Sequence, residues 1–302
     1  MKRVISGTIY VIALLAFFVL KIYVHDLFFD VLIYAFALLG THELVRAYKE
    51  KGKITWTQGA ILYAFAALTI PACAVCEHFF GCGLQVVASC FVVLLVIVFS
   101  LLVFDYEETS LESIGMTLFS AVYPTVFLTM LSLGNHFVAP EAMGVFDSRL
   151  FILLVFTIAP CADTMAFIFG CTMKNKVPQK LAPEISPHKT VIGAIGGLVG
   201  GMIGACALYF IYNSLPWGTG NAPWGTFENI QIWLPIYLLL GLLGAAATTF
   251  GDLVESAIKR KMDMKDMGNL LPGHGGILDR IDGTLFSAVV IYAAFILIYA
   301  IV

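Results

Sequence analysis

The stretch Leu84–Phe104 reads LQVVASCFVVLLVIVFSLLVF and contains no charged residue. A helix needs about 20 apolar residues to cross the hydrocarbon core of a bilayer, with all its backbone hydrogen bonds made internally. This stretch therefore predicts a transmembrane helix. The whole chain agrees, because 60% of its 302 residues are hydrophobic, 12% are charged and the mean hydropathy is +0.93. Such a balance is too apolar for a soluble domain of this length.

Windows of the same length predict about nine membrane spans, and hence an all-α, polytopic fold in a single membrane domain over residues 1–302. Lys2 and Arg3 precede the first span as they would in a signal sequence, but the apolar run is long for one and lacks a convincing cleavage site. The predicted spans are Val4–Val24, Phe28–Tyr48, Gly59–Cys76, Leu84–Phe104, Ile114–Leu133, Leu150–Phe169, Val191–Tyr212, Ile230–Phe250 and Thr284–Val302.

Basic residues gather in alternate connections between these spans. If the N-terminus is cytoplasmic, only Lys21 and Arg149 fall on the outer side. This asymmetry follows the positive-inside rule and predicts a cytoplasmic N-terminus. The basic residues of the inner connections are Arg46, Lys49, Lys51, Lys53, Lys174, Lys176, Lys180, Lys189, Lys259, Arg260, Lys261, Lys265 and Arg280.

One segment is far more polar than the rest of the chain. Residues 251–283 read GDLVESAIKRKMDMKDMGNLLPGHGGILDRIDG, and 11 of the 31 residues from Asp252 to Asp282 are charged, against 26 in the other 271. Charges beside membrane spans are costly unless they are paired, hydrated or bound to ions, so they are candidates for function. We expect the chemistry to lie in this segment.

The order of residues in this segment predicts helix, loop and helix. Asp252, Ser256 and Lys259 share one face of a helix that continues the eighth span. The run Gly268–Gly276 contains Pro272 and two adjacent glycines, which predicts a tight loop whose backbone can approach a ligand.

Three carboxylates flank that loop. Asp279 and Asp282 are three residues apart at the predicted start of the last span, so they share a face near a helix N-terminus. Together with Asp252 they offer the oxygen ligands that Mg²⁺ prefers, and nearby basic residues would neutralise phosphate. The pattern favours metal-assisted phosphoryl or nucleotidyl transfer over a plain basic connection. The nearby basic residues are Lys259, Arg260, Lys265 and Arg280.

A second polar cluster covers residues 163–197. Asp163 and Thr164 lie inside the sixth span, and Ser186-Pro187-His188-Lys189-Thr190 precedes a glycine-dense helix. The glycine spacing favours close helix packing. Ser186 and Thr190 are candidate caps of the seventh span, and Lys189 is a candidate phosphate ligand at its N-terminus.

Cys73, Cys76, Cys82 and His78 cluster near the end of the third span. A metal or disulfide site is one interpretation of this cluster. The ordinary use of cysteine as a small apolar residue in buried helices is the better one.

The polar segment resembles the signature of the phosphatidate cytidylyltransferases, also called CDP-diacylglycerol synthases. The second cluster extends the resemblance through an Asp-Thr pair and a Ser-Pro-x-Lys-Thr run, although Ile192 stands where the family usually has Glu, which puts any role of that Glu in doubt here. The matching signature positions are Ser256, Lys259, Arg260, Lys265, Asp266, Gly268, Pro272, His274, Gly275, Gly276, Asp279, Arg280 and Asp282.

The resemblance implies an integral membrane enzyme that joins CTP to phosphatidic acid, with release of pyrophosphate, at the cytoplasmic face. It implies that Asp252, Asp279 and Asp282 hold Mg²⁺, with room for a second cation, and that the same aspartates act in catalysis with Ser256 and Lys259. It also implies a homodimer, and no nucleic-acid partner is expected. The implied substrate-binding residues are Ser186, Lys189, Arg260, Lys265, His274, Gly275, Gly276 and Arg280.

Two other functions stay open from the sequence. A CTP-dependent lipid kinase would move the γ-phosphate to an alcohol and release CDP instead of pyrophosphate. A transporter would use Asp163 and the helix-end aspartates for a coupling ion, but it would place its charges deep in two opposed repeats. CDP-alcohol phosphotransferases are disfavoured because their Asp-Gly-x-x-Ala-Arg arrangement is not found in the sequence.

Overall fold

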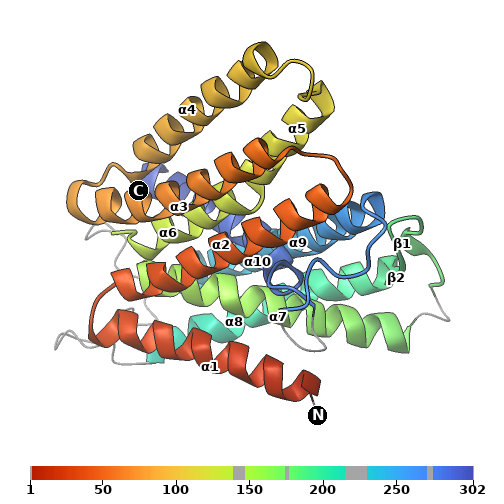
Figure 1. Cartoon of the computed structure of the whole chain (residues 1–302). Helices are drawn as coiled ribbons and strands as arrows, with labels where there is room; N and C mark the ends of the chain where they lie inside the picture. The colour runs from red at the N-terminus through yellow and green to blue at the C-terminus, as the bar shows by residue number, and fades with distance from the viewer. Residues whose placement is uncertain (1, 139–146, 174–176, 215–229, 271–274, 302) are drawn as a thin grey trace. The chain divides into compact units, whose positions relative to one another are not determined.

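The computed structural model describes residues 2–138, 147–173, 177–214, 230–270 and 275–301, with side chains from residue 7 onward. Within these ranges the chain is almost entirely helical, with one short β-hairpin (Figure 1). Packing divides the chain into two compact units, which are described separately. Unit 1 is Met1–His136 with Lys259–Ile281, and unit 2 is Phe137–Ile258 with Asp282–Val302. The single domain expected from the sequence stays a prediction.

Unit 1 is built around helix α2. Buried Phe29, Ile33 and Leu44 form its core face, and α2 packs against both α3 and α6. The helices of this unit are α1 (Lys2–Tyr23), α2 (Leu27–Glu50), α3 (Trp56–Phe80), α4 (Gly83–Phe104), α5 (Leu111–Ser120) and α6 (Phe127–Asn135).

The fifth predicted span is interrupted near its middle. A π-helical turn, η1 (Ala121–Val126), joins α5 to α6, and Tyr123 within it leaves helical backbone angles. Pro124 follows directly, and proline is a common cause of such kinks because it lacks a backbone N–H. At the start of α5 the side chains of Ser110 and Ser113 cap one another's backbone.

Unit 2 contains α7 (Ser148–Thr172), α8 (Val191–Ser214) and most of two long helices, α9 (Ile230–Lys261) and α10 (Leu278–Ile301). Between α7 and α8 lies an antiparallel hairpin of β1 (Lys180–Ala182) and β2 (Ser186–Thr190). The sequence did not predict this hairpin. Ser186 therefore starts a strand and does not cap α8, whereas the predicted cap at Thr190 is confirmed, since Gly193 N donates to Thr190 Oγ1 at 3.1 Å.

The glycines of α8 bring it close to its neighbours. A Cβ placed on Gly200 would lie 2.5 Å from the carbonyl oxygen of Cys161 in α7, and one on Gly201 would lie 2.5 Å from that of Gly241 in α9. No larger residue fits at these positions without moving backbone. The predicted use of these glycines for helix packing is therefore confirmed.

The protein is an integral membrane protein. Eight helical segments of the described chain are long and apolar enough to cross a bilayer, and Gly7–Tyr23 forms a shorter apolar helix. The eight segments correspond to the second to ninth predicted spans, most of them with longer ends, whereas the first predicted span, Val4–Val24, corresponds to the shorter helix. Helix α9 runs to Lys261, well past the predicted end at Phe250, and α10 starts at Leu278, before the predicted Thr284. The two flanks of the polar segment, residues 251–261 and 278–283, are thus helical, as expected.

Candidate active site

Lys259 and Asp279 form a mostly buried ion pair in unit 1. Lys259 Nζ lies 2.8 Å from Asp279 Oδ1, and the two side chains are 15% and 5% exposed. The other oxygen, Asp279 Oδ2, accepts hydrogen bonds from Met267 N at 2.9 Å and Gly276 N at 2.8 Å. One carboxylate thus joins the end of α9, the connecting loop and the first turn of α10.

Gly275 is required by this arrangement for two reasons. Its φ of +85° is a conformation that residues with a Cβ rarely adopt. A Cβ there would also lie 2.5 Å from Asp279 Oδ2. The loop glycine therefore serves Asp279 directly, whatever its role toward a substrate.

A residue outside both polar clusters, Glu43 of α2, holds the start of α10. Glu43 Oε1 accepts a hydrogen bond from Ile277 N at 2.8 Å, and Oε2 accepts one from Leu278 N at 3.0 Å. These N–H groups lie at the N-terminus of α10, where backbone donors have no acceptor within the helix. A negative charge is favourable at that position. Glu43 is only 4% exposed, so both bonds are made away from water.

A second lysine and aspartate pair occurs in unit 2. Lys189, near the end of β2, forms an ion pair with Asp252 Oδ2 on α9. Ser256 lies one turn further along α9, and its Oγ is 3.3 Å from Asp252 Oδ1. The structure thus brings together residues of the two polar clusters that the sequence analysis identified separately.

Asp252 and Asp282 come from closely packed parts of α9 and α10. A Cβ placed on Gly251 would lie 2.6 Å from the backbone oxygen of Asp282, and Gly283 packs in turn against Thr248. The chemistry of this donor set fits Mg²⁺, which takes one or two carboxylates together with substrate phosphates and water. Within the described ranges no group of three or more His, Cys, Asp or Glu side chains is placed to hold a metal ion. Convergence of Asp279 with this pair stays a prediction.

The remaining predicted residues are distributed as follows. Arg260, Lys265 and Arg280 are exposed, so they are accessible to a soluble ligand. Gly276 is buried. His274 lies outside the described residues. The seven cysteines are free thiols.

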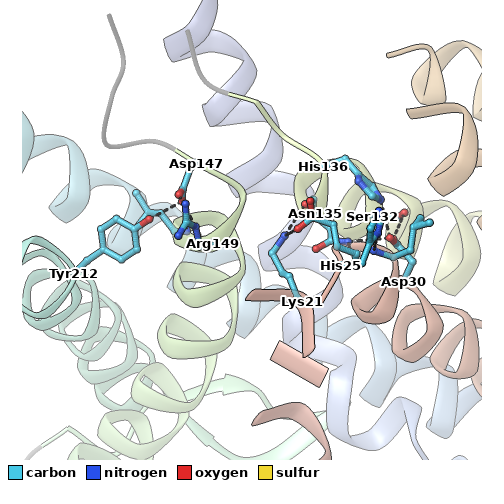
Figure 2. A network of polar contacts seen from close by, with 12 residues as sticks. Lys21, His25, Asp30, Ser132, Asn135, His136, Asp147, Arg149 and Tyr212 are labelled. Atoms are coloured by element: carbon cyan, nitrogen blue, oxygen red, sulfur yellow. Dashed lines mark hydrogen bonds and ion pairs between the residues drawn. The ribbon is translucent and has the colours of Figure 1, made fainter. Parts of the chain in front are cut away.

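A buried polar cluster lies at the other end of α2, in unit 1 (Figure 2). Asp30 accepts hydrogen bonds from Ser132 Oγ at 2.6 Å and Asn135 Nδ2 at 2.9 Å, and its Oδ2 lies 2.7 Å from His136 Nε2. Lys21, which is 4% exposed, donates to the backbone oxygen of Asn135. These contacts fasten α1 and α2 to the end of α6.

Figure 2 also shows a polar contact of unit 2, in which Asp147 caps α7. Its Oδ1 accepts hydrogen bonds from Leu150 N at 2.8 Å and from the Tyr212 hydroxyl at 2.6 Å, and Arg149 pairs with its Oδ2. The contact joins the start of α7 to the end of α8.

The sequence contained a signal for Glu43 and Asp30. Both are acidic residues inside a predicted span, and an ionisable residue there is a candidate for function with a partner to be found. The partners lie far along the chain, more than 100 residues away for Asp30 and 234 for Glu43 and Ile277. No local pattern of spacing could have identified them.

Comparisons with known proteins place these features in a family. A model of the cytidylyltransferase family matches residues 1–298. The chain is 40% identical to a phosphatidate cytidylyltransferase of Staphylococcus aureus over 137 residues, 45% of each chain. It is 35% identical to one of Mycobacterium tuberculosis over 179 residues, which cover 59% of this chain and 46% of the relative. Each match spans less than half of the relative's length.

Proposed function

Since the chain belongs to the cytidylyltransferase family, we propose that it is a phosphatidate cytidylyltransferase, converting CTP and phosphatidic acid to CDP-diacylglycerol and pyrophosphate. An oxygen of the phosphatidate phosphate attacks the α-phosphorus of CTP. The bond from that phosphorus to the bridging oxygen of the β-phosphate breaks, and pyrophosphate leaves. The nucleophile is already an anion, so the reaction needs positioning and charge neutralisation more than a strong base.

The observation that carries this proposal is the occurrence of two lysine and aspartate pairs in the two polar clusters. Lys189 pairs with Asp252, and Lys259 pairs with Asp279. In each pair the lysine ammonium has three N–H donors, so it can bind a phosphate oxygen while it stays paired with the carboxylate. The exposed Arg260, Lys265 and Arg280 would attract the triphosphate of CTP.

We further propose that the enzyme uses Mg²⁺, and that Asp252 and Asp282, with Asp279, hold it. When bound, the ion would neutralise charge on the phosphates of CTP and fix their orientation. Ser256 would orient Asp252, to which its hydroxyl is hydrogen-bonded. The sequence leaves room for a second cation of unspecified identity.

The charge asymmetry of the connections supports a site on the cytoplasmic side of the membrane, where CTP is available. Modification of an engineered cysteine at Lys265 by an impermeant thiol reagent would test this, in a background without the native cysteines. Labelling only in opened cells supports the assignment, and labelling of intact cells contradicts it. A homodimer is part of the proposal, and the mass of the purified protein in detergent tests it.

The central test uses purified protein in detergent with phosphatidic acid, CTP labelled at the α-phosphorus, and Mg²⁺. We expect label in the lipid, an equal amount of pyrophosphate in water, and loss of both on addition of EDTA. Transfer of the γ-phosphate to an added lipid alcohol, with release of CDP, would replace this proposal with a lipid kinase. Asp282→Asn with normal Mg²⁺-dependent turnover would remove Asp282 from the metal ligands.

A further inference from the structure

We infer that Glu43 is a positioning residue for the active site: it fixes the start of α10 and the preceding loop, and so aims Asp279. The claim rests on unit 1, and on its described residues only: Glu43, loop residues 262–270 and 275–277, and the first turn of α10. Its kinetic part rests on the proposed cytidylyl transfer. Its structural part does not.

The first support is the geometry of the carboxylate. Its two oxygens accept hydrogen bonds from two successive backbone N–H groups, Ile277 N and Leu278 N. Asp279 is the next residue, and its own Oδ2 accepts from Met267 N and Gly276 N. Two carboxylates therefore take up four backbone donors of one loop and helix start. Rotation of α10 about its axis would break both Glu43 bonds at once, so the direction of Asp279 depends on them.

The second support is the space around the carboxylate. A Cβ on Gly268 would lie 2.5 Å from Glu43 Oε1, and a Cβ on Gly276 would overlap both carboxylate oxygens. Both glycines have ordinary negative φ, since the positive-φ glycines of the described chain are Gly52, Gly81 and Gly275. Their lack of a side chain is thus explained by the close approach of Glu43 and not by backbone conformation.

The third support is that neighbouring positions of α2 hold the same segment. A Cβ on Gly40 would lie 2.9 Å from Leu278 Cδ2, so α2 and the start of α10 are in close contact there. Arg46 Nη2 is 3.4 Å from the backbone oxygen of Met267. Gly40, Glu43 and Arg46 are three residues apart in turn, so they lie on one side of α2. This side of α2 is therefore the contact surface for the loop and for the first turn of α10.

The variant that tests the inference is Glu43→Gln, which keeps the shape of the side chain. Its amide nitrogen cannot accept a hydrogen bond, so one of the two backbone donors loses its partner. A matched control exists on the same helix. Asp30→Asn also alters a buried, hydrogen-bonded carboxylate of α2, but one that contacts α6.

The first measurement is hydrogen–deuterium exchange of the full-length protein in detergent, followed in peptides that contain Ile277 and Leu278. We expect Glu43→Gln to exchange at least about tenfold faster there, because the protecting bond is lost. Asp30→Asn should exchange there like the unaltered protein. Unchanged exchange in Glu43→Gln, or equal acceleration in Asp30→Asn, would overturn the inference.

The second measurement is turnover. We expect Glu43→Gln to lower kcat at least about tenfold with less than about twofold change in KM for phosphatidic acid. Asp30→Asn should keep its kcat even if it lowers the melting temperature as much. Equal loss of kcat in both variants would mean that Glu43 contributes to stability alone and does not position the active site. If the unaltered protein does not turn over, the proposed function fails, and the exchange measurement still decides the inference.

A second variant guards against a Glu43→Gln protein that does not fold. Gly268→Ala keeps Glu43 but places a methyl group against its carboxylate. It should accelerate exchange at Ile277 and Leu278 as well. Normal exchange and normal kcat in folded Gly268→Ala would contradict the proposed role of Glu43 on the α2 contact surface.

Discussion

The two ends of α2 each bury a carboxylate, yet they use it differently. Asp30 is surrounded by side chains, Ser132, Asn135 and His136, and it ties α2 to α6. Glu43, about 20 Å further along the helix, receives backbone N–H groups from the start of α10. Both are 4–5% exposed. The two acids are therefore equally buried. They differ in their hydrogen-bond partners, which are side chains for Asp30 and backbone N–H groups for Glu43.

The difference teaches where to look for function in a membrane helix. A buried acid whose hydrogen-bond partners are side chains of other helices connects those helices within the bundle. A buried acid that meets the backbone of a polar, glycine-containing loop instead fixes the geometry of groups that the loop carries. Here those groups include Asp279 and, through it, Lys259. The following experiments test this contrast.

The largest effect is expected at the group that Glu43 positions. Asp279→Asn removes the charge that pairs with Lys259 and one acceptor for the loop, and breaking a buried pair in this way costs about 3–5 kcal/mol. If that loss is felt in the transition state, we expect turnover to fall by a factor of about a hundred to a few thousand. Label transfer from CTP to lipid measures it. Turnover within tenfold of the unaltered protein would remove Asp279 from the catalytic residues.

The contact between Glu43 and Gly276 gives the next largest effect. Gly276→Ala places a methyl group against the carboxylate, and we expect it to destabilise the protein by about 1–3 kcal/mol. In a Glu43→Ala background the same change should have little further effect, because the space is then free. Thermal unfolding of the four proteins in detergent measures the coupling. Additive losses would mean that Gly276 is needed for a reason other than Glu43.

The sequence alone predicted the segment that Glu43 holds, but neither of the two buried acids of α2. The helical spacing of Asp252, Ser256 and Lys259 and the helix start near Asp279 are local patterns, and the structure has both of them. The described residues of the predicted loop, 268–270 and 275–276, are not helical. The Lys189 and Asp252 pair was not predicted, since it joins two clusters 63 positions apart. Glu43, the Asp30 cluster and the hairpin at Ser186–Thr190 were missed because each depends on contacts that only the folded chain supplies.

The opposite end of α2 should respond in stability and not in activity. Asp30→Asn weakens charge-assisted hydrogen bonds to Ser132, Asn135 and His136, so we expect a loss of about 1–3 kcal/mol in the free energy of unfolding. The melting temperature in detergent measures this loss. Per folded molecule, lipid labelling should be unchanged. A large fall in kcat at full folding would show that the two ends of α2 are not separate in function.

The smallest effect is expected where a loop charge is exposed. Lys51, just after α2, lies 3.3 Å from Asp263, and the two side chains are 39% and 83% exposed. Water and salt screen such a pair, so Lys51→Ala should change the free energy of unfolding by less than about 1 kcal/mol. Asp263 precedes the loop that Glu43 and Asp279 hold. The variant therefore tests whether an exposed contact to this region also affects exchange or turnover. Unchanged exchange at Ile277 and unchanged turnover would confine the effect to the buried contacts. A tenfold loss of turnover would instead show that the exposed pair also positions the loop.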